Sequence, residues 1–380
     1  MSDVDLLIVG AGPYGLAIAA YAKHRDLSTC VVGEPMGFWK HNMPARMLLR
    51  SSVDWHLDPL GTYTFEAFLR DRSLDPACVT PIPVGLFLEY AEWFRMRSGI
   101  EVVQELVVSL RAAGSTFEAD LESGGHITAR RVVVATGYKP YKSIPQETVA
   151  GLPPERYVHS CDLVEFSALR GKRCLVVGGR QSAFEWAALI NEECDAEVHV
   201  VYRHDAPSFE ASDWSWIDKH VDETLALRGW YRNLPKADRQ AVDRQFWETA
   251  KLKLEPWLWD RLGREGIMSW PRRSIVGCRM SADGQIEVNL DNQSRLRVDF
   301  LVLATGFVVD IRREPLVSDP SIASRLQVVD GYPVLDESFQ STLPGLYFVG
   351  LTSTRDFGPF FGFVRGCTAT ARLLVETLVA

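Results

Sequence analysis

The chain alternates short apolar runs with longer segments of mixed polarity, in the order expected of strands and helices. Residues 5–9 (DLLIV) and 29–32 (TCVV) are short apolar runs, and between them residues 16–23 have helical spacing of their apolar positions. The same order returns with the apolar runs 174–177 and 197–202 around a second helical segment. Apolar runs separated by helices indicate parallel strands buried on both faces. The pattern therefore predicts an α/β fold with two strand-helix-strand units.

The first apolar run ends in the glycine-rich turn Gly10-x-Gly12-x-x-Gly15, which opens the helical segment. Gly10 permits a tight turn, Gly12 lets the backbone approach a pyrophosphate, and Gly15 lets the helix lie close to the strand. The free N–H groups at the helix N-terminus attract phosphate. Glu34 ends the next strand, about 20 residues on, where a carboxylate can accept hydrogen bonds from a ribose. The turn predicts a Rossmann-like dinucleotide site, although an ordinary glycine loop would use the same residues.

A second turn, Gly178-Gly179-x-x-Ser182-Ala183, also follows an apolar run and opens a helical segment. Its next strand ends in Arg203 and His204, where the first unit has an acid. A guanidinium binds a 2′-phosphate bidentately, whereas a carboxylate repels it. The second turn therefore predicts NADPH rather than NADH; a solvated surface arginine is the alternative.

Each half of the chain closes with a similar strand, VVVATG ending at Gly137 and LVLATG ending at Gly306. Short runs broken by turns precede each ATG and predict a small β-meander. These runs are 102–110, 116–122 and 126–129 in the first half and 274–280, 286–290 and 295–298 in the second. A repeat of this length indicates a duplicated dinucleotide-binding domain. We predict one domain from residues 1–150 and 313–380 and a second from residues 151–312.

A stretch near residues 205–272 interrupts the second domain and is rich in tryptophan. Its tryptophans are Trp214, Trp216, Trp230, Trp247, Trp257, Trp259 and Trp270. Aromatic side chains can roof a ligand pocket or stack on a planar substrate. The apolar spacing over 214–218 and 246–250 favours a helical insertion that packs onto the second domain.

Composition limits the classes of function. The 380 residues, 47% of them hydrophobic, suffice for two or three domains. A net charge of −8, without a basic run, disfavours nucleic acid as a partner. No segment reaches the roughly 18 consecutive apolar residues of a membrane helix, and the N-terminus leads directly into a strand. We expect a cytoplasmic protein that binds neither nucleic acid nor a membrane, with homo-oligomerisation left open.

The seven cysteines and eight histidines are dispersed along the chain. An odd, scattered set of cysteines fits the reduced thiols of the cytosol. No CxxC pair occurs, although two-nucleotide enzymes that reduce disulfides normally carry a paired cysteine motif. No HxxxH or HExxH spacing occurs either, which disfavours a metal site. We therefore expect no metal, and electron transfer to an acceptor other than a disulfide.

Together these features resemble the two-dinucleotide-binding-domain flavoproteins, and among them the NADPH-dependent class B flavin monooxygenases. Residues 299–307, DFLVLATGF, are similar to the D-x-x-x-L-A-T-G-Tyr pattern of the microbial N-hydroxylating monooxygenases that act on ornithine or lysine, with Phe307 in place of Tyr. Residues 47–69 and 209–240 resemble the substrate-proximal segment and the insertion of those enzymes. The chain is shorter than they are, and its carboxyl-terminal ending departs from theirs.

The resemblance implies FAD at the first turn and NADPH at the second. It implies an oxidoreductase that uses NADPH and O₂ to hydroxylate a small polar substrate through a C4a-(hydro)peroxyflavin, at nitrogen of an amine or amino acid. Hydroxylation of a heteroaromatic ring such as urate is the nearest alternative. An NADPH-dependent flavin reductase without oxygen insertion and a non-catalytic flavin redox sensor are the others.

Polar residues after the first unit are the catalytic candidates. Asn42 lies in a segment that resembles the one beside the isoalloxazine ring, where it can bond the flavin edge or the nicotinamide; a turn residue is the alternative. Arg46 and Arg50 can hold a flavin phosphate or an anionic substrate, or lie on the surface. Asp54 and His56 can bind an amine or relay a proton, or cap a turn.

The carboxyl-terminal run 355–363, RDFGPFFGF, follows the last apolar run. In the resembling family this position lies beneath the flavin ring and starts the final helix. Its glycines would let the backbone approach the ring, and its phenylalanines would exclude water. A plain core loop would use the same residues. The predicted cofactor-binding residues are Gly10, Gly12, Pro13, Gly15, Glu34, Trp39, Arg46, Ala135, Thr136, Gly137, Gly178, Gly179, Gln181, Ser182, Arg203, Ala304, Thr305, Gly306, Gly350, Gly358, Phe360 and Phe361.

Overall fold

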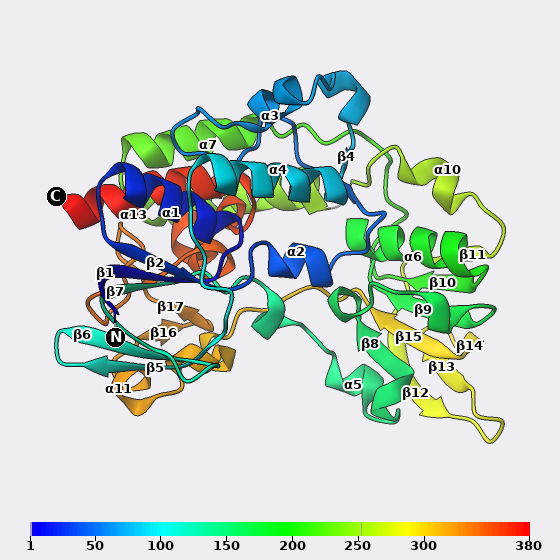
Figure 1. Ribbon diagram of the computed structural model, residues 1–380. Coiled ribbons are helices and arrows are strands. Elements are labelled where there is room, and N and C mark those ends of the chain that lie inside the picture. The colour runs from blue at the N-terminus through cyan, green and yellow to red at the C-terminus, as the bar shows by residue number, and fades with distance from the viewer. Residues whose placement is uncertain (1, 252) are drawn as a thin grey trace.

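The computed structural model describes residues 2–251 and 253–380 and has two lobes (Figure 1). The first lobe contains both ends of the chain, and the second is formed by the middle of the chain, drawn in green and yellow. The chain thus leaves the first lobe, builds the second, and returns. Within the described residues, no helix is long and apolar enough to cross a membrane.

The first lobe is built on a sheet in the order β2-β1-β7-β6-β5, with β18 also paired to β7. β1, β2, β7 and β18 run parallel, while β5, β6 and β7 form the antiparallel meander. Leu6, Leu7 and Ile8 of β1 are fully buried, as expected of a central parallel strand. The bounds are β1 Ser2–Val9, β2 Thr29–Val32, β5 Val107–Ala113, β6 Thr116–Leu121, β7 His126–Val134 and β18 Leu346–Phe348, with helices α1 Pro13–His24, α4 Val84–Arg97 and α13 Arg365–Val379.

The second lobe repeats this plan with a parallel sheet in the order β11-β10-β9-β15-β8. Its meander, β12-β13-β14, forms a separate antiparallel sheet. The bounds are β8 Tyr157–His159, β9 Arg173–Val177, β10 Glu197–Val201, β11 Ile267–Trp270, β12 Ile275–Met280, β13 Ile286–Leu290, β14 Arg295–Val298 and β15 Phe300–Leu303, with helix α6 Gln181–Cys194.

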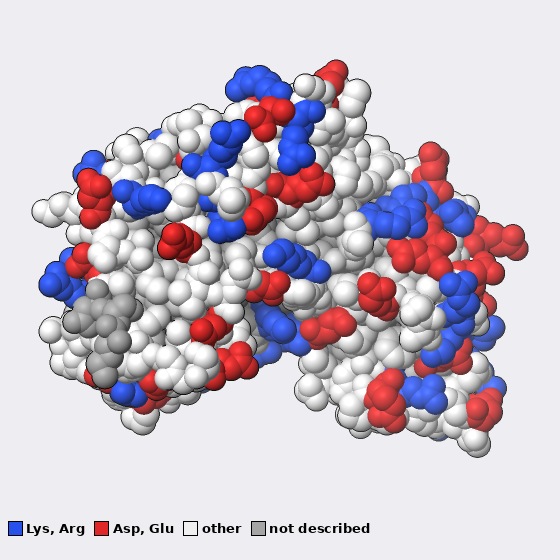
Figure 2. All heavy atoms as spheres, viewed as in Figure 1, with Lys and Arg blue, Asp and Glu red and all other residues white. Residues whose placement is uncertain are grey.

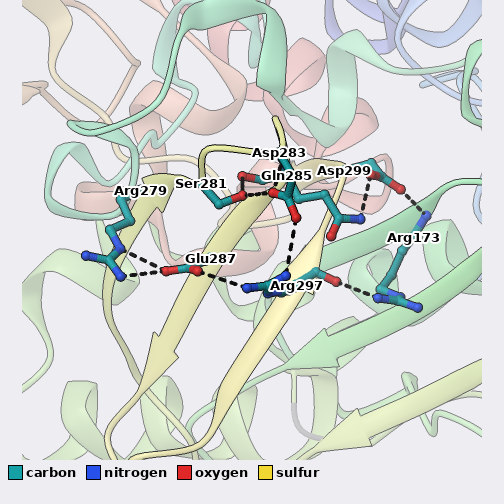
Figure 3. A network of polar contacts seen from close by, with 8 residues as sticks. All are labelled: Arg173, Arg279, Ser281, Asp283, Gln285, Glu287, Arg297 and Asp299. Atoms are coloured by element: carbon teal, nitrogen blue, oxygen red, sulfur yellow. Dashed lines mark hydrogen bonds and ion pairs between the residues drawn. The ribbon is translucent and has the colours of Figure 1, made fainter.

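A polar network attaches the second meander to the parallel sheet (Figure 3). Asp299 lies between β14 and β15, and its carboxylate accepts hydrogen bonds from the backbone N of Arg173 at 2.9 Å and from Nε2 of Gln285 at 3.2 Å. On the meander itself, Arg297 pairs with Asp283 at 3.2 Å. The first lobe needs no such junction, because β7 runs continuously from its meander into its parallel sheet.

Two linkers cross between the lobes and pair with one another. The backbone N of Ser143 donates to the carbonyl of Gly306 at 2.9 Å, and the backbone N of Val308 donates to the carbonyl of Tyr141 at 2.8 Å. The outgoing and returning segments therefore satisfy each other's backbone groups. This pairing ties the segments that follow β7 and β15 to each other.

The insertion bridges the two lobes. Helix α7, Ser215–Ala226, lies against α13, and Trp214, Ile217 and Phe246 belong to the hydrophobic core of the first lobe. Leu254 and Leu258 pack instead in the core of the second lobe. The expectation that the insertion packs onto the second domain is therefore wrong for Trp214, Trp216 and Trp230, because the apolar face of α7 is buried against the first lobe.

The α/β class and the order of the elements are as the sequence predicts. The bounds differ most at two places: the run 102–110 begins its ladder only at Val107, and residues 126–134 form one strand rather than two. The remaining elements are α2 Gly37–His41, β3 Leu48–Leu49, α3 Phe65–Asp71, β4 Ile82–Pro83, α5 Gln146–Val149, α8 Trp230–Asn233, α9 Lys236–Gln245, a π-helical turn Phe246–Lys251, α10 Leu258–Leu262, α11 Pro320–Ala323, β16 Val328–Val329, β17 Tyr332–Pro333 and α12 Thr354–Phe357.

Candidate active site

A cavity of about 1970 Å³ lies between the lobes and is lined by both glycine turns. In the space-filling view the surface is hollowed between the lobes (Figure 2). A pocket for one drug-sized ligand measures about 300–1,000 Å³. The volume therefore suits more than one ligand. The predicted cofactor-binding residues that line it are Gly10, Gly12, Pro13, Glu34, Trp39, Ala135, Thr136, Gly137, Gly178, Gly179, Gln181, Ser182, Arg203, Ala304, Thr305, Gly306 and Gly350.

The glycines of the first turn allow close backbone packing and leave an open side at the start of α1. Gly10 has a φ of 112°, and a Cβ there would lie 2.3 Å from the carbonyl oxygen of Ala135. A Cβ on Gly15 would lie 1.8 Å from the carbonyl oxygen of Gly10, whereas one on Gly12 would meet nothing within 4 Å. Among the described residues, no side chain caps the N-terminus of α1. Its first N–H groups thus face a cradle shaped for an anion.

Glu34 follows β2 at the cavity wall, where the ribose acceptor was predicted. Its carboxylate contacts Nε2 of His41 at 2.8 Å and Nζ of Lys40 at 3.8 Å. Both partners lie on α2, so this short helix holds the acid at the rim. The Glu34 side chain remains 43% exposed and can still accept hydrogen bonds from a ligand.

The second turn repeats the packing of the first. Gly178 has a φ of 146°, and a Cβ there would lie 2.4 Å from the carbonyl oxygen of Ala304. The alanine of each ATG sequence therefore packs against the first glycine of its turn. Ala183 takes the place of the third glycine and is buried, so this helix lies far enough away to admit a methyl group.

Three arginines line the cavity around the second turn: Arg180, Arg203 and Arg273. Within residues 2–251 and 253–380, none of the three has a carboxylate partner. Arg180 and Arg273 were missed by the sequence argument. The signal for Arg180 was available, because it is the N-cap residue directly before α6, the position that the second glycine, Gly12, occupies before α1. Burial, together with the nearby Arg203, lowers the pKa of Arg180 to about 10.

Each ATG turn is held by a buried titratable side chain. Thr136 donates to Oε2 of Glu314 at 2.6 Å, and Nε2 of His159 contacts the carbonyl of Gly306 at 2.9 Å. Because Nδ1 of His159 accepts from the backbone N of Cys161, Nε2 is the donor to Gly306. Burial raises the pKa of Glu314 and lowers the pKa of His159, so both groups favour their neutral forms.

Asn42 and Arg50 line the cavity, and both connect separate parts of the structure. Asn42 is buried, and its Nδ2 donates across the lobes to the carbonyl of Cys161 at 2.8 Å. Arg50 pairs through Nε with the buried carboxylate of Glu255 at 2.9 Å and lies over the ring of Trp214. Both side chains therefore hold separate segments of the chain together, whether or not they also contact a ligand.

The structure does not bring Asp54, His56 and Arg46 to the cavity. Asp54 is exposed, and Nδ1 of His56 accepts from the backbone N of Asp58 at 3.2 Å, as the turn alternative predicted. Arg46 is 61% exposed and reaches Glu192 on α6 at 3.5 Å. Its contact is a surface ion pair between the lobes, so Arg46 is not placed to hold a flavin phosphate.

In the carboxyl-terminal run, Pro359, Gly362 and Phe363 line the cavity, whereas Phe360 and Phe361 are fully buried behind it. Gly358 and Gly15 also lie outside the lining and act through packing. Tyr14 donates to the carbonyl of Phe363 at 2.9 Å, and Tyr138 donates to the carbonyl of Gly362. The run thus forms a fixed wall whose lining residues are neighbours of the predicted ones.

An aromatic group occupies the wall near the insertion. Trp55 and Trp214 have ring centroids 5.4 Å apart, and Phe246 and Phe363 have centroids 5.6 Å apart. Trp214 and Phe363 connect the two pairs at 6.5 Å. Segments from three parts of the chain therefore build an apolar wall that can exclude water. No cysteine is among the described residues that line the cavity.

Comparison with known proteins relates this architecture to oxidoreductases. A sequence model of the pyridine nucleotide-disulphide oxidoreductases matches residues 7–229. An FAD-dependent urate hydroxylase of Xanthomonas campestris pv. campestris is 27% identical over 87% of this chain and 73% of its own length. The solved ornithine N-hydroxylase of Kutzneria sp. 744 has a TM-score of 0.79 at 20% identity, covering 99% of both chains. The ornithine hydroxylase of Pseudomonas aeruginosa has a TM-score of 0.81 at 18% identity, covering 100% of this chain and 99% of its own.

At these structural identities the likeness concerns the fold. It confirms the predicted α/β architecture of two Rossmann-like units and the predicted resemblance to N-hydroxylating flavin monooxygenases at that level. The sequence match confirms the predicted enzyme class, an oxidoreductase.

Proposed function

The chain belongs to the pyridine nucleotide-disulphide oxidoreductase family, and we propose that within it the protein is an FAD- and NADPH-dependent monooxygenase. The substrate is a small polar molecule, hydroxylated at nitrogen of an amine or amino acid. The observation that carries this proposal is the cavity that both glycine turns share, since it allows two nucleotides to meet.

The residues present fit FAD at the first turn. A Cβ at Gly10 or Gly15 would collide with backbone, and the open side of Gly12 leaves room for a pyrophosphate. Glu34 would accept hydrogen bonds from the ribose, and the wall Pro359, Gly362 and Phe363 would lie against the ring. When bound, FAD accepts a hydride from NADPH and activates O₂.

The residues of this chain would orient the reactants and keep water out. Tyr14 and Tyr138 fix the carboxyl-terminal wall through backbone carbonyls, and Asn42 ties the lobes together beside it. Trp55, Trp214 and their aromatic neighbours remove water from the space where oxygen chemistry would occur. No cysteine is among the described residues that line the cavity, and this argues against transfer of electrons to a disulfide, although the family is named for disulphide oxidoreductases.

Ring hydroxylation is the second candidate, and a specific observation favours it. The wall near the insertion is aromatic, and Arg50 there is already paired with Glu255. Such a wall suits a planar ring by stacking. The 27% identical relative is named a urate hydroxylase, which agrees with this candidate.

The test supplies NADPH and isotopically labelled O₂ to the purified holoenzyme with two substrate panels, amines such as ornithine, lysine and putrescine, and heterocycles such as urate. NADPH oxidation, O₂ uptake, hydrogen peroxide and product mass are measured together. We expect labelled hydroxylated product from the amine panel with little peroxide. Product from the heterocycle panel would establish the second candidate instead. NADPH oxidation that yields only peroxide or reduced acceptor would indicate a reductase, and binding of FAD without NADPH oxidation would indicate a sensor.

A further inference from the structure

Arg180 contacts the ring of Trp247, and a Rossmann-like dinucleotide turn does not require this contact. Its guanidinium carbon lies 3.5 Å from the ring centroid of Trp247. Trp247 belongs to the π-helical turn Phe246–Lys251 of the insertion, and π-helical turns are frequent at functional sites. Both side chains line the cavity, and Trp247 remains 46% exposed. The insertion therefore reaches the second glycine turn at this point.

The charges around this contact are unbalanced. Arg203 follows β10 beside the same turn and is close enough to disfavour the charge on Arg180. Arg273 follows β11 and also lines the cavity, while the neighbouring Arg272 pairs with Asp205 at 3.4 Å outside it. Within the described part of the chain, no carboxylate neutralises Arg180, Arg203 or Arg273. Two close guanidiniums without an anion repel each other, and a doubly charged anion between them removes the repulsion.

A phosphate monoester supplies such an anion, since it carries about −1.5 to −2 charge at neutral pH. Ligands of parallel sheets bind outside the carboxyl ends of the strands, where Arg203 and Arg273 lie. We propose that Arg180 acts with Arg203 to bind the 2′-phosphate of NADPH, and that Trp247 is a positioning residue that holds Arg180 toward it. The inference rests on the proposed NADPH dependence and makes the insertion part of the coenzyme site.

The test uses two probes that differ only in the 2′-phosphate, adenosine 2′,5′-bisphosphate and adenosine 5′-monophosphate. Calorimetry on the FAD-containing protein measures their affinities without any turnover. Arg180→Ala should weaken the bisphosphate by roughly 10- to 100-fold, the value of a lost charged hydrogen bond, and the monophosphate by less than about threefold. Arg180→Lys should fall between, because it keeps the charge and loses the planar fork.

Trp247→Leu should weaken the bisphosphate by about two- to fivefold and leave the monophosphate unchanged, as expected of an exposed cation–π contact. Trp259→Leu and Arg264→Ala are the matched controls, since both residues are exposed outside the cavity, and neither should change either affinity by as much as twofold. The ratio of kcat/KM for NADPH to that for NADH should fall in Arg180→Ala in parallel with the bisphosphate affinity.

Equal weakening of both probes by Arg180→Ala would assign Arg180 to the 5′-phosphate and overturn the inference, as would no change in either. An unchanged bisphosphate affinity in Trp247→Leu would remove the positioning role. If the wild-type protein bound neither probe, the proposed coenzyme itself would be wrong. Thermal unfolding of each variant separates loss of binding from loss of the fold, and Arg180→Lys keeps the test informative if the alanine variant does not fold.

Discussion

The two glycine turns share the same close backbone packing at their first glycine and differ in the charged side chains around it. In both, the first glycine packs against the carbonyl of an ATG alanine, at 2.3 Å from the Cβ position of Gly10 and 2.4 Å from that of Gly178. The first turn lies beside the acid Glu34, whereas the second contains Arg180 and lies beside Arg203. The two turns thus share the steric contact at their first glycine and differ in the charge beside it, an acid after β2 in one and arginines before α6 and after β10 in the other.

The two ATG turns also differ in the side chain that holds each of them. Thr136 of the first ATG turn binds Glu314 of the returning linker, and Gly306 of the second binds His159 at the end of β8. One partner is a buried acid and the other a buried base. The two turns therefore respond to pH in opposite directions.

The largest effect is expected at the third small residue of the fingerprint, which is Gly15 in the first turn and Ala183 in the second. Gly15→Ala would place a methyl group 1.8 Å from the carbonyl oxygen of Gly10, so we expect a loss of more than about 3 kcal/mol in the free energy of unfolding and loss of bound FAD. Ala183→Gly should cost only about 1–2 kcal/mol, from helix propensity and a lost buried methyl. Urea unfolding and the FAD content of the purified variants measure both. A Gly15→Ala protein with full FAD content would show that the first turn does not need its third glycine.

Arg203→Glu gives the second turn the charge of the first. We expect kcat/KM for NADPH to fall by about 100-fold, because a charged hydrogen bond is lost and repulsion is added, while kcat/KM for NADH changes by less than about threefold. Steady-state kinetics with both coenzymes provide the measurement, and Arg203→Gln separates the lost attraction from the added repulsion. Equal losses with both coenzymes would remove Arg203 from the 2′-phosphate site.

The pH dependence of stability tests the linkers. The lowered pKa of His159 means that the unfolded chain binds more protons below the ordinary histidine value of 6.5, so stability is lost as pH falls below it, at most about 1.4 kcal/mol per pH unit for one group. His56, His199 and His220 act in the same direction, since burial lowers the pKa of each. His159→Gln should make the acid side of the profile shallower.

Glu314 acts in the opposite sense. Its raised pKa means that the folded protein binds more protons above the ordinary value of 4.5, so stability is lost as pH rises from there toward the raised pKa. Glu314→Gln should remove that loss, so the stability of the variant relative to the wild type should increase as pH rises. Denaturant titrations at several pH values give both profiles, and parallel profiles for wild type and variant would contradict the assignment.

The smallest effect is expected for Arg46, which joins the lobes only at the surface. Arg46→Ala should change the free energy of unfolding by less than about 1 kcal/mol, the usual limit for an exposed ion pair. FAD affinity, followed by flavin fluorescence during dilution, should change by less than twofold. A larger loss of FAD would restore Arg46 to the phosphate site that the sequence suggested.

The sequence predicted the elements of both turns closely because their signals are local. Glycines with positive φ, apolar strands and a helix directly after the turn lie within one short stretch, and the prediction for β2 agrees with the structure at both ends. The insertion was placed on the wrong lobe, because an apolar helix face does not specify its partner. α7 had two surfaces available, and only the packing against α13 decided between them.

By itself, the sequence determined the fold class, the duplication, the two turns and the acid and arginine at their strand ends. Only the tertiary structure decided which charged side chains reach the cavity: Arg46, Asp54 and His56 do not, and Arg180 does. The physical reason is distance along the chain. A turn is specified by neighbouring residues, whereas the role of Arg180 depends on Trp247 and Arg203, which come from separate segments and meet only in the folded protein.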